Sequence, residues 1–533
     1  MSLVFELAPP LAAPNRHRAD VACFIGFVAR RANRPLPAGL RAQLKDGGWT
    51  DGIWRRPEAQ VESLENLPVA IDGWDMFDRL FAWDERPLTA DGDKRCATYL
   101  GAAVRSFFAR GGKRAIVIRA GDPWPYLEST AQRAARRRVR IRRLVPDFAE
   151  RGAVAHPFEP HNPATWLGIH HLYGLRENSM LVMPDLADAC TFELPVPEVA
   201  VLPPPLPEVF VECSEDEPVD VDTGLRHVSA PRLDSRGYAA WKLAVSAARE
   251  FLARHQREVL LLAALPLPHV DTQRVSGAGR VHAQADMLAY LRRAGVLRAD
   301  AASAPSDQGT ASAFVQLAWP WLRTHASDDL PEGLEPPDGV LAGLISASAT
   351  QRGSSRSVAG DFSIPRLRDV AGAEPVPSWG LGDDSPSAQL AKHVCVIAQS
   401  PNGWALQSDV TTSPQEAWRF GGASRLMGSI VRAARSTGDT VAFGANGPAL
   451  WAQLRSGIED MLMGYWFEGA FAGATASQAF SVRCDRSTMT QADLDNGRLI
   501  VEISVRPAAS IERITVVLNL GNSATVGAVR EVA

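Results

Sequence analysis

The clearest pattern of hydrophobic and polar positions lies near the C-terminus, between residues 449 and 520. Apolar residues recur at steps of three and four over residues 450–466, which predicts a helix with one wide apolar stripe. Pro448 stands at the first helical position, where its missing N–H group costs nothing. The stripe comprises Leu450, Trp451, Leu454, Ile458, Met461, Leu462, Tyr465 and Trp466.

A strand follows this helix after a polar loop. Between residues 499 and 505 apolar and polar positions alternate, which is typical of a strand with one buried face. A second strand is predicted over residues 514–520. Helix, loop and two strands form a packing unit, and nothing in it resembles a reaction centre.

The preceding chain alternates between helix and strand patterns. Residues 21–31 predict a buried strand, and a helix over residues 99–110 leads into a strand over residues 115–118. A long amphipathic helix is predicted over residues 238–256. Another helix begins near Asp338, because the two prolines before it cannot lie in a helix interior. This order predicts a mixed α/β protein.

Length and composition indicate several domains and no export signal. At 533 residues the chain exceeds the size of one hydrophobic core, so we expect two to four domains or subdomains. Six cysteines without a CxxC pair suggest neither a disulfide framework nor a zinc cluster. There is no basic N-terminal region before an apolar run, and no apolar stretch of about 18 residues. We therefore expect a protein that is cytoplasmic when made.

Two stretches have the composition of arms or linkers. The short apolar run Leu3-Val4-Phe5 lies ahead of several prolines, and a lone strand of this length must pair with something else. Residues 192–223 are rich in proline, and positions 208–222 hold seven acidic residues and no basic one. We expect the first stretch to be a terminal arm and the second to be an extended insertion.

An arginine-rich run occupies residues 133–143, with seven arginines in eleven positions. One interpretation is a patch for nucleic acid or an acidic partner. The other is a solvated surface, or one balanced within the chain by the acidic residues 208–222. The second is favoured, since no aromatic residue interleaves with the arginines as single-strand binding requires, and the net charge of −4 gives no pull toward nucleic acid.

Candidate sites for chemistry are weak. The histidine cluster has no recognised zinc-ligand spacing, so structural histidines are expected; its members are His156, His161, His170 and His171. Gly111-Gly112 follows a helix and precedes a strand, whereas nucleotide-binding glycine loops run from strand to helix. No GxSxG, Walker lysine, HExxH or Rossmann glycine motif is present. We therefore predict no catalytic residues, no cofactor, no metal and no enzymatic activity.

Several blocks resemble contractile tail sheath proteins of phages and phage-tail-like injection systems. Residues 102–123, AAVRSFFARGGKRAIVIRAGDP, are similar to the family's helix, glycine pair and strand. Residues 484–503, CDRSTMTQADLDNGRLIVEI, are similar to its C-terminal core, and Trp319-Pro320-Trp321 and the segment around Trp418-Arg419 fit in order. The resemblance covers most of residues 20–518, apart from 192–223.

This resemblance implies a multi-subdomain α/β, mixed α+β fold with a C-terminal α/β core, a larger outer domain and terminal arms for strand exchange. We expect an N-terminal arm at 1–20, an outer domain at 21–375 containing the linker at 192–223, a tube-facing core at 376–510 and a C-terminal arm at 511–533. It also implies a structural subunit that polymerises as stacked, commonly hexameric, rings around an inner tube and contracts to drive that tube through a target envelope.

The implied partners are further copies of the chain, the inner tube protein, and baseplate and cap proteins, with no nucleic acid and no membrane insertion. Assembly is expected in the cytoplasm, as part of a particle that is then released. Arm exchange between neighbours would use Leu3, Val4, Phe5, Ile514, Val516 and Leu518.

A tube-facing surface is predicted on the helix at 425–435, with Arg425, Arg432 and Arg435 exposed toward an acidic wall; a solvated basic face is the other interpretation. Two further hypotheses stay open. The departure from the family pattern at Phe420-Gly421-Gly422 suits a sheath-related cap or terminator. A soluble α/β enzyme with an unidentified site belongs to a different class.

Overall fold

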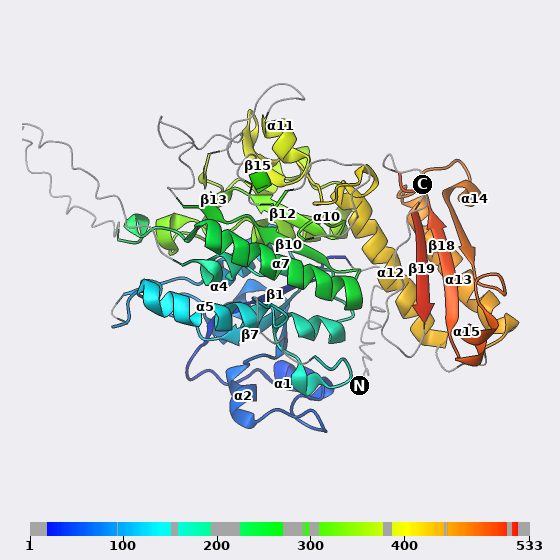
Figure 1. Cartoon of the computed structure of the whole chain (residues 1–533), viewed down its shortest axis with the longest axis horizontal. Coiled ribbons are helices and arrows are strands. Elements are labelled where there is room, and N and C mark those ends of the chain that lie inside the picture. The colour runs from blue at the N-terminus through cyan, green and yellow to red at the C-terminus, as the bar shows by residue number, and fades with distance from the viewer. Residues whose placement is uncertain are drawn as a thin grey trace, which may run out of the picture.

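The computed structural model describes residues 19–92, 94–150, 158–192, 224–269, 291–293, 295–297, 309–376, 386–441, 444, 446–508 and 514–520. Leu3-Val4-Phe5, His156 and the acidic residues 208–222 lie outside this part of the chain. Figure 1 shows a large body that contains most of the chain and a smaller C-terminal body beside it.

An eight-stranded sheet forms the centre of the large body. Its order is β16-β15-β12-β10-β8-β1-β7-β3. The six inner strands run parallel, and β16 and β3 join the two edges in antiparallel orientation. The strands are β1 (Ala22–Phe27), β3 (Pro68–Ile71), β7 (Ala115–Gly121), β8 (Met180–Val182), β10 (Leu260–Ala264), β12 (Val315–Trp319), β15 (Cys395–Ser400) and β16 (Gly403–Leu406).

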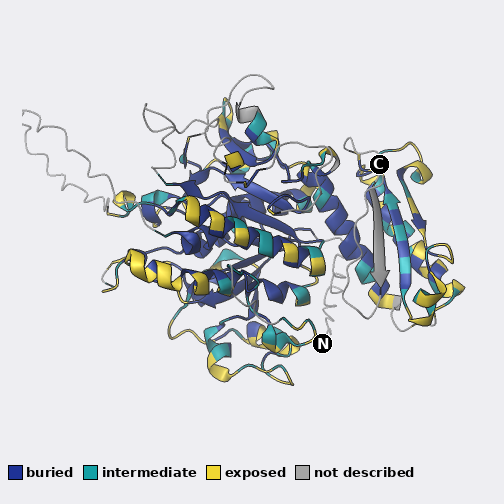
Figure 2. Ribbon diagram, viewed as in Figure 1, coloured by how far each residue is buried: buried dark blue, intermediate teal, exposed yellow. Residues whose placement is uncertain are grey.

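The inner strands are apolar because both faces of the sheet are covered. Every residue of β1, β7, β8, β10 and β12 is buried, as expected for a parallel sheet between two layers. Figure 2 shows this buried centre beneath helices with exposed outer faces. The helices of this body are α1 (Ala38–Asp46), α2 (Glu58–Ser63), α3 (Trp74–Leu80), α4 (Tyr99–Ala109), α5 (Thr130–Leu144), α6 (Leu186–Cys190), α7 (Ser235–His255), α10 (Asp338–Arg352) and α11 (Pro386–Ala391).

Close packing of α4 against α10 depends on two glycines. A Cβ at Gly339 would lie 2.6 Å from the backbone of Ala103, and a Cβ at Gly343 would lie 2.8 Å from the backbone oxygen of Phe107. Both distances are too short for a real side chain, so α4 and α10 can approach this closely only because residues 339 and 343 are glycine. Short two- and three-residue strands complete the body: β2 (Ala29–Arg30), β4 (Phe81–Ala82), β5 (Arg86–Pro87), β6 (Arg95–Cys96), β9 (Arg232–Leu233), β11 (Leu267–Pro268), β13 (Trp321–Arg323) and β14 (Gly372–Glu374).

The C-terminal body has its own hydrophobic cluster. A three-stranded antiparallel sheet of order β17-β18-β19 lies beside two long helices. The elements are α12 (Gly421–Val441), α13 (Pro448–Phe467), α14 (Ala476–Ala479), β17 (Phe480–Arg483), α15 (Gln491–Asp495), β18 (Leu499–Val505) and β19 (Ile514–Leu520). The division predicted at residue 376 stays a prediction; β15 and β16, which follow it, pair with strands of the large sheet.

Several predicted elements are confirmed. The strand expected at 21–31 is divided into the buried β1 and the short, half-buried β2, the helix at 99–110 is α4, and the helix expected near Asp338 begins at that residue. Helix α13 begins at Pro448, and β18 alternates between buried and half-buried positions along its whole length. Among the described residues, no helix combines the length and apolarity needed to cross a membrane.

Candidate assembly interface

The C-terminal sheet is built on one amphipathic strand. In β18 the four apolar residues at odd positions are buried and the residues between them are half-buried. The buried side joins the cluster that includes Leu454, Ile458 and Leu462 of α13. On the other side Glu502 pairs with Arg483 of β17. Strand β18 therefore has a packed face toward α13 and a second face that carries Glu502 and Ser504 together with the half-buried Ile500.

Strand β17 forms one edge of this sheet. Its four residues pair only with Glu502–Val505, the second half of β18. Beyond that, the Thr488 hydroxyl donates to the backbone oxygen of Ile500 at 2.9 Å. A groove of about 290 Å³ lies beside β17, lined by Ser477, Gln478, Ala479, Phe480, Ser481, Ser504, Val505 and Arg506. An edge strand next to a groove can accept a further strand through its free backbone groups.

Strand β19 carries the predicted C-terminal arm residues Ile514, Val516 and Leu518. It pairs with β18 of the same chain over its full length, from Leu499 opposite Leu520 to Val505 opposite Ile514. Exchange of this strand between subunits stays a prediction, as does the N-terminal arm at Leu3-Val4-Phe5.

A buried ion pair joins α12 to the large body. Asp409 accepts from Arg425 at 2.9 and 2.6 Å, from the Gln316 amide at 2.9 Å and from the Val358 backbone N–H at 3.0 Å. Burial alone would raise the pKa of Asp409, but the guanidinium and the other hydrogen bonds hold that pKa below its usual range. This carboxylate ties together α12, β12 and the loop after α10.

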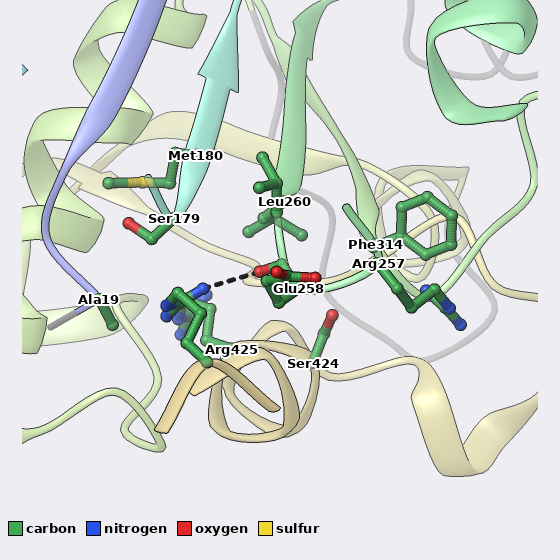
Figure 3. Close-up of a pocket in the computed structure, with 11 residues that line it drawn as sticks. Ala19, Ser179, Met180, Arg257, Glu258, Leu260, Phe314, Ser424 and Arg425 are labelled. Atoms are coloured by element: carbon green, nitrogen blue, oxygen red, sulfur yellow. Dashed lines mark hydrogen bonds between the residues drawn. The ribbon is translucent and has the colours of Figure 1, made fainter. Parts of the chain in front are cut away.

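A second contact anchors α12 at Glu258, two residues before β10. Arg432 donates to the backbone oxygen of Glu258 at 2.8 Å, and Arg435 pairs with its carboxylate. Figure 3 shows this junction, where Glu258 and Arg425 line a cavity of about 10 Å³, room for about one water. Burial lowers the pKa of Arg432, and the nearby Glu258 carboxylate opposes that shift.

The exposure predicted for the three arginines of α12 is therefore wrong for two of them. Arg425 is 6% exposed and Arg432 is 8% exposed, and both bind groups of the large body. Only Arg435 is partly open to solvent, with 29% of its side chain exposed. The physical reason is that Asp409 and Glu258 supply acceptors inside the chain. Sequence reasoning missed both; the signal for Glu258 was a charged residue directly before a buried strand.

The glycines of α12 explain its departure from the family pattern. A Cβ at Gly421 would lie 2.2 Å from a carboxylate oxygen of Asp409, and one at Gly422 would lie 2.3 Å from the backbone oxygen of Ser355. Gly428 approaches the Glu258 backbone oxygen in the same way, at 2.7 Å. The helix is continuous from Gly421, and its glycines let it contact backbone and carboxylate directly.

The arginine-rich run forms α5, and much of its charge is balanced within the chain. Arg133 pairs with Asp188, Arg137 with Glu150 and Arg140 with Glu128. These three arginines are buried. The favoured interpretation of charges balanced within the chain is thus confirmed for them, although the acceptors come from described elements and not from residues 208–222.

Two histidines of the predicted cluster, His170 and His171, are buried and structural, whereas His161 is exposed. His170 contacts Asp147 at 3.2 Å, and His171 is buried against Trp49 and Trp166. Burial lowers the pKa of His171 to about 3, and the Arg56 charge acts in the same direction. Within the described ranges no group of three or more potential metal ligands occurs.

Three buried carboxyl groups lie away from this interface. Burial raises the pKa of each to about 7, for Asp185, Glu335 and Asp338. Asp185 accepts from the Phe27 backbone N–H at 2.7 Å, at the carboxyl end of β1. The cavity beside the neighbouring Met183 measures about 10 Å³, so it admits about one water and no substrate. Asp185 thus joins β1 to the start of α6, and Glu335 joins α4 to the segment after β13 by accepting from Ser106 and Thr324.

The protein was compared with known families, curated sequences and solved structures. No family model matches the sequence, and no curated protein matches it. Among solved structures, a chain of the anti-feeding prophage baseplate in the contracted state aligns with a TM-score of 0.54 and 16% identity, covering 96% of this chain and 95% of that one. A chain of the six-fold symmetrised baseplate of the same particle aligns with a TM-score of 0.50, 16% identity and 96% coverage of both chains.

A chain of the anti-feeding prophage helical sheath in the contracted state aligns with a TM-score of 0.48, 17% identity and 95% coverage of both chains. The two baseplate alignments span nearly the whole of this chain, including both hydrophobic bodies. This chain therefore has the fold of the subunits in those baseplate structures, which confirms the multi-subdomain α/β fold implied by the sheath resemblance.

Proposed function

We propose that this protein is a structural sheath subunit of a contractile phage-tail-like particle. It polymerises as stacked rings around an inner tube and contracts to drive the tube through a target envelope. The observation that carries this proposal is the fold likeness over 96% of the chain to subunits of a contractile particle. The sheath-like sequence blocks at residues 102–123 and 484–503 support it independently.

The C-terminal body is the proposed assembly surface. An open β17 edge beside a groove offers backbone groups to a strand from a neighbour. The proposed donors are the N-terminal run Leu3-Val4-Phe5 and the strand that contains Ile514, Val516 and Leu518. Such contacts join different surfaces of successive copies, and contacts of that kind build open tubes.

The proposed partners are further copies of the chain, the inner tube, and baseplate and cap proteins. Of the three arginines predicted to face the tube, Arg435 has the most exposed side chain, at 29%, although it also pairs with Glu258, and it is retained as a candidate contact. In this proposal the subunit assembles in the cytoplasm and becomes part of a released particle. No catalytic step is assigned to it.

A second candidate function is a sheath-related subunit at the end of the particle rather than along its length. The observation that favours it is that the two alignments with TM-scores of 0.50 and 0.54 described above come from baseplate structures. This subunit would form one ring and would not propagate a tube.

Negative-stain electron microscopy of the purified full chain tests the proposal. Tubes with stacked rings support a sheath, and single rings support the baseplate candidate. A monodisperse particle of one or two chains that also fails to add to purified tubes would contradict both.

Two truncations test the arms. Removal of residues 1–12 leaves the described residues intact, so the protein should stay folded with an unchanged unfolding midpoint yet form no tubes. Removal of residues 514–533 takes away β19 as well and should also prevent polymerisation. Long tubes from either truncated chain would show that strand exchange does not hold the assembly together.

A further inference from the structure

The outer face of α5 presents positive charge that the described residues do not fully neutralise. We define this face by Arg136, Arg138, Val139 and Arg143, all exposed or nearly half exposed. Arg136 forms no ion pair within the described part of the chain. Val139 is 58% exposed among these arginines, so the face combines charge with a small apolar surface.

The carboxylates around α5 are shared between arginines. Asp188 contacts both Arg86 and Arg133. Glu150 likewise contacts both Arg137 and Arg138. Glu65 contacts Arg119 and Arg143, whereas Glu128 serves a single arginine, Arg140. The guanidinium groups therefore outnumber the carboxylates around the helix, and a nearby anionic segment would lower the energy of this positive charge.

Both ends of the segment 193–223 are held beside α5. At its start, the Phe192 ring lies between two guanidinium groups, 4.3 Å from that of Arg137 and 4.5 Å from that of Arg236. Six positions after its end, the Ser229 backbone oxygen accepts from the Tyr126 hydroxyl at 2.6 Å; Tyr126 precedes α5, and its backbone oxygen accepts from Arg133 of α5 at 2.6 Å. The chain therefore leaves and returns next to the arginine helix.

The charge of this segment is complementary to that face. Residues 208–222 contain seven acidic residues and no basic one, and they end only two positions before Gly224, where the described chain resumes. A short tether of this kind gives a high effective concentration of the segment at the helix, on the order of millimolar.

We infer that residues 208–222 dock on the outer face of α5 of the same chain. The acidic residues bind Arg136, Arg138 and Arg143 there and screen the arginine surplus from nucleic acid and from other acidic surfaces. The acidic insertion has no counterpart in the sheath-like pattern. It thus acts as a negatively charged segment of the chain that covers the arginine face of α5.

A fluorescent label on Cys213 tests this docking in the full-length protein. Cys213 lies within the acidic segment, and the other five cysteines are buried, so a maleimide dye reports on the segment. We expect high anisotropy of the dye at 0.1 M salt and lower anisotropy at 1 M salt, because the screening length falls from about 10 Å to about 3 Å. Anisotropy that does not respond to salt would overturn the inference.

Charge reversal identifies the partner surface. Arg136→Glu combined with Arg138→Glu should lower the anisotropy at 0.1 M salt to the high-salt value. Each reversed arginine should weaken the equilibrium constant for docking of the segment by about two- to five-fold. The matched control is Arg455→Glu with Arg486→Glu, two exposed arginines of the C-terminal body. An equal effect of the control pair would contradict docking on α5.

Further measurements test whether the arginine reversals act by misfolding the protein, and whether another molecule rather than the segment binds the α5 face. Glu212→Gln, Glu215→Gln and Glu217→Gln together change only the segment and should lower the anisotropy as the arginine reversals do. In the chain that lacks residues 1–12, which should not polymerise, anisotropy that rises with protein concentration would assign the segment to another copy and overturn docking within the chain. Binding of duplex DNA by the unmodified protein at 0.1 M salt, lost on reversal of Arg136 and Arg138, would also overturn it.

Discussion

Arg425 of α12 and Asp409 of the large body form a bidentate ion pair in which the side chains are only 4% and 1% exposed. Asp409 also holds Gln316 and the Val358 backbone, so one carboxylate fixes three segments that are distant in the sequence. The two bodies are therefore joined by a polar contact that water does not reach, and this contact leads to the first prediction.

Asp409→Asn should destabilise the protein by about 3–5 kcal/mol, because it leaves the buried Arg425 without a counter-charge. Urea unfolding monitored by tryptophan fluorescence measures the loss. The control Glu459→Gln removes an exposed ion pair with Arg455 on α13 and should cost less than about 0.5 kcal/mol. Equal effects of the two substitutions would mean that the Asp409 pair does not hold α12 in place.

Gly428→Ala should destabilise the protein although it raises helix propensity. The added Cβ would lie 2.7 Å from the Glu258 backbone oxygen, a rigid group, and relief of that overlap costs about 1–3 kcal/mol. Gly464→Ala in α13 meets no atom within 4 Å and should instead stabilise by about 0.5–1 kcal/mol. Thermal unfolding of both variants distinguishes a contact effect from a propensity effect; the same sign for both would contradict the close approach.

Asp185 should make stability fall as pH rises toward neutrality. Burial raises its pKa from 3.8 to about 7, so the folded state holds the proton more tightly than the unfolded state. That contribution is complete below about pH 4 and is lost as pH rises through 7. Asp185→Asn stays uncharged, so the stability of the natural protein relative to this variant should fall by at most about 4 kcal/mol between pH 4 and 8.

Urea unfolding at several pH values between 4 and 8 measures this difference. The exposed Asp361→Asn variant serves as the control, and its curve should run parallel to that of the natural protein. A parallel curve for Asp185→Asn as well would show that Asp185 does not titrate in this range.

His171 should make the stability of the protein fall as the pH decreases. Burial lowers its pKa from 6.5 to about 3, so its contribution is complete above pH 6.5 and is lost as pH falls toward 3. His171→Phe keeps a ring between Trp49 and Trp166 but cannot be protonated. Between pH 8 and pH 5 the natural protein should lose about 2 kcal/mol more stability than this variant. The exposed His325→Gln provides the control; a natural protein that matches His171→Phe at pH 5 would refute the prediction.

The sequence predicts helices and strands well where the periodic pattern of apolar residues is itself the physical cause of the element. The alternation in β18 and the Pro448 start of α13 follow directly from which side chains are buried. The end of α4 at Gly111-Gly112 is also set by the local residues. Gly111 has a φ of +102°, and a Cβ at Gly112 would overlap the Phe107 ring, so both positions require glycine. Such features depend on residues that are close together in the sequence, so they can be predicted from it.

The burial of the arginines could not be predicted in the same way. Arg425 and Arg432 lie on one helix side, and charge alone favours exposure of that side. Their acceptors, Asp409 and Glu258, come from other elements, one of them 174 residues away from Arg432. Only the tertiary contact decides between a solvated basic face and an internal junction.

The contact of Arg432 with a main-chain oxygen has a mechanical consequence. Glu258 lies two residues before β10, which occupies an inner position of the eight-stranded sheet between β8 and β12. A force applied to the C-terminal body through α12 thus enters the large body at the root of an inner strand as well as at the buried Arg425–Asp409 pair. Because β10 is paired in parallel with β8 and β12, a pull on Arg432 is shared with the strands on both sides of β10.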